Sequence, residues 1–225
     1  MAAFFDEIDW KIVGKASNET LYMLGYSLLF TFVLGLLLGV LLFVTSDKQM
    51  LGGKFFARLI YSILSLVVNI LRSVPFIILM IMIMPVTKWL VGTSIGVEGS
   101  IPPLVVAAVP FFARLVESAL REVDRGVIEA ATAMGASRVM IVFHVLLRES
   151  RTGLIAAITI TAVTLVSYTA MSGVIGGGGL GDLALRYGYQ RFEVEVMIVT
   201  VVLLIVLVQI LQMAGDAFVR YFSRK

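Results

Sequence analysis

Residues that commonly carry catalysis are scarce in this chain. Its 225 residues include no cysteine and a single histidine, His144. A thiolate nucleophile or thiolate metal site is therefore excluded, and a zinc site or a Ser-His-Asp arrangement has little support. Neither H-E-x-x-H nor G-x-S-x-G occurs, which disfavours a hydrolase. We expect no catalytic, cofactor-binding or metal-binding residue in the chain.

A glycine-rich segment matches the sequence pattern of a dinucleotide-binding site. Gly176, Gly178 and Gly181 satisfy the pattern G-x-G-x-x-G. A dinucleotide site needs a β-strand before this pattern and a helix after it, whereas a long apolar run precedes it here. The phosphate-cradling motif G-x-x-x-x-G-K-[ST] is absent from the sequence. If the protein works with ATP, a separate subunit must therefore hydrolyse it.

Arg72 lies within an otherwise apolar run, residues 59–84, which also contains Pro75. A charge inside such a run is costly in a membrane, so it usually faces a cavity, a partner or a free backbone carbonyl. Because proline has no N–H, Pro75 cannot bond back to the Leu71 carbonyl, which the guanidinium could satisfy instead. Both this structural role and a place on a translocation path remain open.

A polar stripe follows in a later apolar run, residues 153–174. Its members recur at helical spacing on one face: Thr161, Thr164, Tyr168, Met171 and Ser172. Such a face belongs in the protein interior and not in lipid. It could line a translocation path, where the flexible Met171 would form an adaptable apolar plug. The alternative is helix packing, with the hydroxyls bonded to their own backbone.

These residues lie in a chain with the composition of a membrane protein. Hydrophobic residues make up 60% of the chain, and the mean hydropathy is +1.01. A membrane helix needs about 20 apolar residues, and the apolar runs are residues 21–44, 59–84, 101–116, 153–174 and 194–213. The sequence therefore predicts an all-α integral membrane protein with about five transmembrane helices. Gly35 and Gly39 form a face on which a neighbouring helix can approach closely.

The distribution of Lys and Arg predicts the orientation of these spans. One side holds Lys48, Lys54, Arg58, Arg114, Arg121, Arg125, Arg138, Arg148, Arg151, Arg220, Arg224 and Lys225, whereas the other holds Lys11, Lys15, Lys88, Arg186 and Arg191. The first side is expected to be cytoplasmic, which leaves the N-terminus outside and the C-terminus inside. The positive-inside rule also explains the net charge of +3, so we expect no nucleic-acid partner.

The N-terminus carries three acidic residues, Asp6, Glu7 and Asp9. It has no apolar core before Thr20, so we do not expect a cleavable signal peptide. We predict an external N-terminal segment at residues 1–19, a membrane domain at 20–218 with a hydrophilic cytoplasmic loop at 117–152, and a cytoplasmic tail at 219–225. The segment 176–195 is predicted to be a glycine-led external loop.

The string EAATAMGASRVMIVFHVLL, residues 129–147, predicts a helix, a tight turn and a second helix. Ile128, Ala131 and Met134 are spaced as on a short amphipathic helix. Gly135 can adopt the left-handed conformation that ends a helix, and Ser137 can cap the next one. This pair of helices suits insertion into a partner's groove, or equally an interfacial position with no partner.

The same string resembles the EAA signature of ABC importer permeases. The resemblance rests on the spacing of Glu129, Ala130 and Ala131 from Gly135, although Arg148 stands where the family usually has proline. It implies a coupling helix that docks on an ATP-binding subunit. The residues expected to couple to that ATPase are Glu129, Ala130, Ala131, Met134, Gly135 and His144.

Three further strings are similar to methionine importer permeases: residues 69–79, 92–96 and 176–192. This resemblance covers nearly the whole chain and implies a type I ABC importer permease of the bacterial cytoplasmic (inner) membrane. It implies a homodimer with two copies of an ABC ATPase, which binds ATP and Mg, and an external substrate-binding protein, periplasmic or lipoprotein. Membrane lipids complete the expected partners.

The candidate translocation path comprises Arg72, Thr164, Tyr168 and Met171, and the candidate external docking residues are Gly178, Gly179 and Gly181. The glycine segment is alternatively a flexible turn. An importer of another small solute remains an alternative function. An ATP-independent carrier or channel is a further one, although no internal repeat of the kind found in many carriers is visible.

Overall fold

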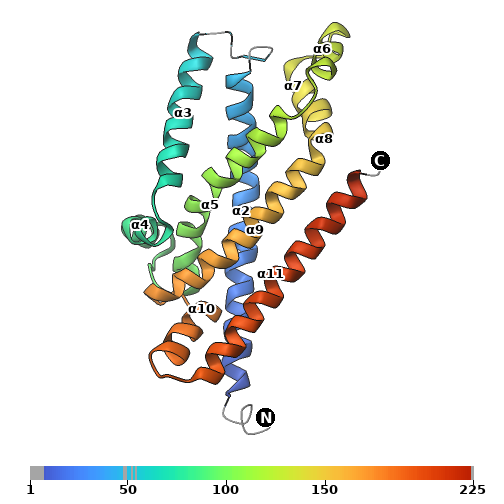
Figure 1. The fold of residues 1–225 in the computed structure, drawn as a ribbon. Helices are drawn as coiled ribbons and strands as arrows, with labels where there is room; N and C mark the ends of the chain where they lie inside the picture. The colour runs from blue at the N-terminus through green and yellow to red at the C-terminus, as the bar shows by residue number, and fades with distance from the viewer. Residues whose placement is uncertain (1–7, 48–49, 52, 54, 224–225) are drawn as a thin grey trace. The chain divides into compact units, whose positions relative to one another are not determined.

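The computed structural model describes residues 8–47, 50–51, 53 and 55–223, and all regular secondary structure in them is helical (Figure 1). Five helices are long and apolar enough to cross a membrane: α2 (Trp10–Ser46), α3 (Phe55–Ser73), α5 (Gly96–Arg121), α9 (Arg151–Ser172) and α11 (Val194–Ser223). The shorter elements are α4 (Phe76–Val91), α6 (Arg125–Ala133), α7 (Arg138–Met140), α8 (Leu147–Glu149), α10 (Gly179–Leu183), the π-helices η1 (Ile141–Leu146) and η3 (Ala184–Tyr189), and the 3-10 turn η2 (Gly173–Ile175). The predicted all-α class with five spans is confirmed.

Helix α2 begins earlier than the predicted first span, which started at residue 21. The Asp9 side chain accepts a hydrogen bond of 2.9 Å from the Lys11 N–H, and the Asp9 carbonyl accepts from Ile12 and Val13. These bonds satisfy backbone donors that a helix start leaves without partners. The expected external segment 1–19 is therefore helical from Trp10 onward, whereas residues 1–7 lie outside the described part of the chain.

The predicted second span, residues 59–84, is wrong as a single helix. The structure divides it into α3 and α4 at Val74 and Pro75. A residue before proline is pushed away from the helical conformation, and Pro75 is the N-cap of α4, with φ −56° and ψ 136°. Arg72 consequently lies in the last turn of α3 and is exposed, so it is not a charge at mid-span.

The predicted third span, residues 101–116, is too short. Helix α5 contains 26 residues and runs on to Arg121, into the segment expected to form the hydrophilic loop from residue 117. Pro102 and Pro103 are the seventh and eighth residues of this helix, past its first turn, so they leave the carbonyls of Glu98 and Gly99 without the usual i→i−4 donor. The helix continues past its apolar stretch because the charged residues there pair with one another, as described below.

The predicted external loop, residues 176–195, is also largely helical. It contains α10 and η3, and only short turns separate these from α9 and α11. The segment is anchored to the rest of its unit, because the Gly96 N–H donates to the Gly176 carbonyl at 3.0 Å. The structure therefore shows this segment as an ordered helical connection and not as a flexible turn.

The chain forms two compact units, each with its own core. Unit 1 comprises residues 1–30, 74–107 and 162–213, and one of its apolar clusters gathers Val13, Ala16, Leu180, Leu183 and Val196. Unit 2 comprises residues 31–73, 108–161 and 214–225. All Lys and Arg residues assigned above to the cytoplasmic side fall in the ranges of unit 2, and all those assigned to the outside fall in unit 1. Lys48, Lys54, Arg224 and Lys225 lie outside the described residues.

Within unit 2, α2 and α5 approach closely at the two predicted glycines. A Cβ atom on Gly35 would lie 2.7 Å from the Phe112 ring, and one on Gly39 would lie 2.6 Å from the Val116 Cβ. Only glycine permits this distance, because any larger residue would need the helices to separate. The predicted close-approach face of the first span is therefore confirmed.

Candidate functional site

The EAA segment forms the predicted helix, glycine turn and second helix in unit 2. Helix α6 is capped by Asp124, whose Oδ1 accepts a hydrogen bond of 2.6 Å from the Gly126 N–H. Gly135 has φ +82°, the left-handed conformation that glycine adopts without strain. The Ser137 Oγ then accepts from the Met140 N–H at 3.3 Å and begins α7. Figure 1 shows this pair of short helices following the end of α5.

The six predicted coupling residues divide by exposure. Glu129, Ala130, Met134, Gly135 and His144 are exposed, and His144 lies in the π-helical turn η1. Ala131 is instead buried in an apolar cluster with Ile128, Val116, Leu120, Ile141 and Leu146. Ala131 therefore fastens α6 to the end of α5, whereas the other five residues are accessible to a partner.

Large apolar side chains are also exposed on this segment of short helices, residues 125–149, which we call the coupling protrusion. Met134 is 81% exposed, Val139 67% and Phe143 61%. Charged residues accompany them in the same segment, among them Glu129, Arg138 and Arg148. Exposed apolar side chains rimmed by charged residues are typical of a protein–protein contact. Val139 and Phe143 extend the set of candidate contact residues beyond those found in the sequence.

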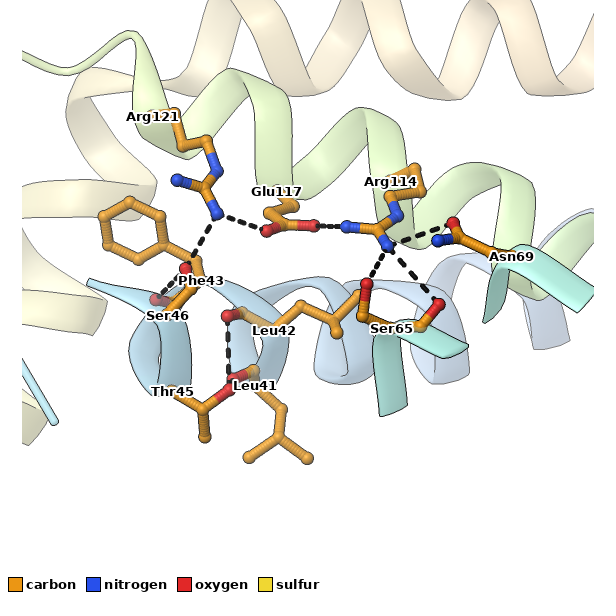
Figure 2. A network of polar contacts seen from close by, with 10 residues as sticks. All are labelled: Leu41, Leu42, Phe43, Thr45, Ser46, Ser65, Asn69, Arg114, Glu117 and Arg121. Carbon is orange, nitrogen blue, oxygen red and sulfur yellow. Dashed lines mark hydrogen bonds and ion pairs between the residues drawn. The ribbon is translucent and has the colours of Figure 1, made fainter. Parts of the chain in front are cut away.

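A network of charges lies on α5 immediately before this protrusion. Glu117 is placed between two guanidinium groups, with Oε2 at 2.5 Å from Arg114 and Oε1 at 2.6 Å from Arg121. Its side chain is only 3% exposed. Figure 2 shows the carboxylate between both arginines on the same helix. A buried carboxylate needs such partners, because an unpaired buried charge is strongly destabilising.

The two arginines extend this network to other helices of unit 2 (Figure 2). Arg114 donates to the Ser65 hydroxyl and, at 3.1 Å, to the Asn69 side chain, both on α3. Arg121 donates to the Ser46 hydroxyl on α2 at 2.9 Å. The network therefore joins α2, α3 and α5. Sequence reasoning missed it, although charges at positions 114, 117 and 121 share one face of a helix.

The predicted polar stripe of α9 is only partly interior. Thr161 and Ser172 are fully buried, and their hydroxyls donate to the carbonyls of Ala157 and Thr169 at 2.8 and 2.7 Å. For these two residues the packing alternative is confirmed. Thr164 and Tyr168 are half-buried and Met171 is exposed. The Tyr168 ring stacks on Phe76 of α4, with ring centroids 4.4 Å apart.

Of the four candidate path residues, Thr164, Tyr168 and Met171 belong to unit 1, and Arg72 belongs to unit 2. Ser167, which sequence reasoning missed, is also exposed on α9, between Thr164 and Met171. Positions 160, 164, 167, 171 and 174 share a helix face, and Thr164 and Ser167 place two hydroxyl groups on it. The exposed face of α9 is therefore suited to a protein or water-filled surface.

Close packing and backbone conformation largely explain why the three candidate docking residues are glycines. Gly178 and Gly179 have φ near +80°, and the Gly179 N–H donates to Glu19 of α2 at 2.9 Å. A Cβ atom on Gly179 would lie 2.6 Å from the Thr20 Oγ1. Gly181 is buried against the backbone of Ala170. Of the three, only Gly178 is partly accessible.

Comparison with known proteins gives consistent matches over nearly the whole chain. Residues 33–225 match the family described as binding-protein-dependent transport system inner membrane component. The probable D-methionine transport system permease protein MetI of Vibrio cholerae is 52% identical over 91% of this chain and 89% of its own length. The methionine import system permease protein MetP of Bacillus subtilis is 46% identical over 99% of this chain and 98% of its own.

Solved structures agree with these sequence matches. A chain of the MetNI methionine ABC transporter in an inward-facing conformation superposes with a TM-score of 0.89 at 47% identity, covering 95% of this chain and 97% of that one. An amino acid ABC transporter with histidines superposes with a TM-score of 0.78 at 16% identity, covering 97% of this chain and 98% of that one. The second match concerns the fold alone.

Proposed function

The chain belongs to the family of binding-protein-dependent transport system inner membrane components, and we propose from this membership that it is the permease subunit of an ABC importer for methionine-type amino acids. The observation that carries the substrate is the 46% identity to a methionine import permease over 99% of the chain. The fold is that of a type I ABC importer permease. The protein spans the bacterial inner membrane several times.

The proposed assembly is a homodimer of this permease with two copies of an ABC ATPase. ATP and Mg bind the ATPase, and this chain breaks no bond. An external substrate-binding protein, periplasmic or lipid-anchored, delivers the amino acid, with Gly178, Gly179 and Gly181 in or beside its docking surface. Residues 1–19 are assigned to the outside, 20–218 to the membrane domain with the coupling loop 117–152, and 219–225 to the cytoplasmic tail.

The proposed coupling proceeds through the packing of unit 2. Glu129, Ala130, Met134, Gly135 and His144 are exposed and would contact the ATPase. Ile128 and Ala131 share an apolar cluster with Val116 and Leu120 of α5. A displacement of α6 must therefore move the end of α5, because close-packed side chains transmit strain. The network around Glu117 would pass the same displacement to α2 and α3.

The proposed translocation path uses the exposed face of α9. Thr164, Ser167 and Met171 would face the second copy of the permease around a common axis, with Tyr168 held beside them by Phe76. Arg72 is retained as a candidate on the evidence of its charge in a membrane span, now at the end of α3. Alternating access would then expose this path to one side of the membrane at a time.

Uptake of radiolabelled methionine tests the proposal. The permease is expressed with its ATPase and substrate-binding protein in cells that lack other methionine uptake. We expect uptake that unlabelled methionine suppresses and that disappears when the phosphate-binding lysine of the ATPase is replaced. Uptake that survives this replacement would point to an ATP-independent carrier, and suppression only by a different solute would reassign the substrate.

A further inference from the structure

A cavity of about 420 Å³ lies entirely within unit 1, and the candidate docking residues Gly178 and Gly179 form part of its lining. Its lining comes from the beginning of α2, the beginning of α5 and the segment from Gly176 to Tyr187. Four charged side chains face it: Lys15, Glu19, Asp182 and Arg186. In the predicted orientation this cavity opens on the outside of the membrane, on the same segment as the candidate docking glycines.

The four charges form two neighbouring pairs of opposite sign. Arg186 donates to Asp182 through Nε at 3.1 Å and through Nη2. The Asp182 carboxylate raises the pKa of Arg186 by hydrogen bonding and by its charge, and the guanidinium is a permanent cation as in any arginine. The second pair is looser, since the Lys15 Nζ lies 3.8 Å from the Glu19 Oε1. The cavity therefore has equal numbers of cations and anions.

In both pairs, charged atoms that line the cavity can make further contacts with a ligand. The Lys15 side chain is 79% exposed, and within the part of the chain that the structure describes its one ion pair is the long contact with Glu19. Among the described residues, no acceptor is bonded to the Nη1 of Arg186, whose two other nitrogens hold Asp182. The Glu19 Oε2 accepts a hydrogen bond from the Gly179 N–H at 2.9 Å, which fixes the carboxylate in place. Of the residues that the structure describes, only Lys15 contacts Oε1.

Tyr187, four glycines and a set of apolar side chains line the remainder of the cavity. Ile12, Ala16, Val97 and Leu183 contribute to it, and Ala16 and Leu183 are buried members of the core of unit 1. The charged groups and this apolar wall together match a small molecule with one carboxylate, one ammonium and an uncharged side chain. A ligand with an additional charge would leave that charge without a partner, which costs binding energy.

We propose that this cavity binds a free zwitterionic amino acid with an uncharged side chain. The α-carboxylate contacts Lys15 and Arg186, and the α-ammonium contacts Glu19 and Asp182. This inference deepens the proposed function and rests on it for the choice of methionine as the probe. The cavity then receives the substrate on the outer side, before the substrate reaches the path along α9.

A photoreactive analogue of methionine tests this site in the intact permease–ATPase assembly in lipid nanodiscs. After illumination, mass spectrometry locates the label. We expect labelled peptides from residues 12–19 and 178–187, with labelling suppressed by methionine or norleucine. Lysine, glutamate and methionine amide, which lacks the carboxylate, should suppress it at least about tenfold less well, because a charge-assisted hydrogen bond is lost or a charge is unpaired.

Two conservative variants and a control sharpen this experiment. Lys15→Gln removes the charge and shortens the side chain by one bond, whereas Glu19→Gln keeps the size of the side chain and an acceptor for the Gly179 N–H. Each should lower labelling about tenfold or more at a fixed probe concentration. Lys11→Gln, an exposed cation on the same helix outside the cavity lining, should leave labelling unchanged. Label elsewhere in the chain, or label unaffected by both cavity variants, overturns the proposal.

Uptake measured with the same wild-type assembly in proteoliposomes separates this inference from the proposed function. ATP-dependent methionine uptake without label in the cavity would overturn the cavity site and leave the function standing. Label in the cavity without uptake would overturn the proposed function instead. If labelling appears only when the substrate-binding protein is present and methionine does not compete, the charges serve protein docking, and the amino-acid site is wrong.

Discussion

The Arg114 guanidinium lies 2.5 Å from the Glu117 carboxylate, one turn further along α5, and the Glu117 side chain is 3% exposed. Charges are rare within membrane spans and almost always paired. Here one carboxylate is shared by two arginines, and the arginines also reach Ser65 and Ser46. The arrangement stabilises the junction of α2, α3 and α5 at the point where α5 leads to the coupling protrusion.

Replacing Glu117 should destabilise the permease. Glu117→Ala leaves two guanidinium groups without their shared carboxylate, and removing one partner of a buried ion pair costs about 3–5 kcal/mol. We expect a lower midpoint of thermal unfolding for the purified assembly in nanodiscs and weaker coupling between ATP hydrolysis and uptake. The matched control is Glu122→Ala, an exposed position just beyond the end of α5. Equal unfolding midpoints for the two variants would contradict the role assigned to the network.

At Gly135, the effect of backbone conformation can be tested without a steric clash from a larger side chain. Its φ is +82°, and a Cβ atom there would meet no atom within 4 Å. Gly135→Val should therefore fail through left-handed backbone strain of about 1–2 kcal/mol, whereas Gly135→Asn should be tolerated because asparagine adopts this conformation more readily. We expect ATP-dependent uptake to fall at least about tenfold in the valine variant only.

Co-purification of the ATPase checks the cause of that loss. The valine variant should retain less ATPase than the wild type or the asparagine variant after detergent extraction. If both substitutions abolish uptake equally, the surface of the turn matters more than its conformation, and the strain argument is wrong.

Local signals in the sequence predicted the coupling protrusion and the number of spans. The helical form of the external segment depends instead on contacts between residues far apart in the sequence. Gly135 and Ser137 carry their own capping information, so the helix, turn and helix could be predicted. The helical form of residues 176–195 could not, because the N–H groups of Gly179 and Leu180 are satisfied by Glu19 and Thr20, which are 160 residues away in the sequence. Such partners are invisible to a local pattern.

The errors in the boundaries of the second and third spans have different causes. An average of hydropathy over residues 59–84 hides the break, although Pro75 marks it on steric grounds. The end of α5 was missed because Arg114, Glu117 and Arg121 were each counted as hydrophilic. Paired with one another they extend the helix instead. To predict the end of α5, one would have had to ask whether these three residues share one face of a helix, and not only whether each of them is charged.

Gly39 should tolerate no side chain. A Cβ atom there would lie 2.6 Å from the Val116 Cβ, and overpacking of this kind costs about 1–3 kcal/mol. Gly39→Ala should therefore lower the thermal unfolding midpoint of the assembly. Gly25→Ala, on the same helix with no atom within 4 Å of the new Cβ, is the control and should leave the midpoint unchanged or raise it.

A compensating substitution distinguishes this clash from a general loss of helix flexibility. Combining Gly39→Ala with Val116→Ala removes the Val116 Cγ1 atom, 2.7 Å from the new Cβ, and leaves the Val116 Cβ at 2.6 Å and the Ala113 carbonyl oxygen at 2.7 Å. Part of the clash is relieved, so the pair should be somewhat more stable than the sum of the two single effects. Strict additivity would show that the two residues do not interact, contrary to the structure.

The exposed face of α9 should lie near its counterpart in the second permease, and the absence of cysteine from the chain makes this directly testable. Ser167→Cys and Met171→Cys each introduce a single thiol on that face. A disulfide requires Cα atoms within about 7 Å, so mild oxidation should yield a covalent dimer on non-reducing gels for at least one variant. The comparison is Val202→Cys on α11, a side chain that is 49% exposed; we expect this position to face lipid, so the variant should remain monomeric. Alternating access requires this yield to change when a non-hydrolysable ATP analogue is added, because the two faces separate or approach as the path opens. Cross-linking through Val202→Cys alone would place α11, and not α9, at the axis and would remove Thr164, Tyr168 and Met171 from the path.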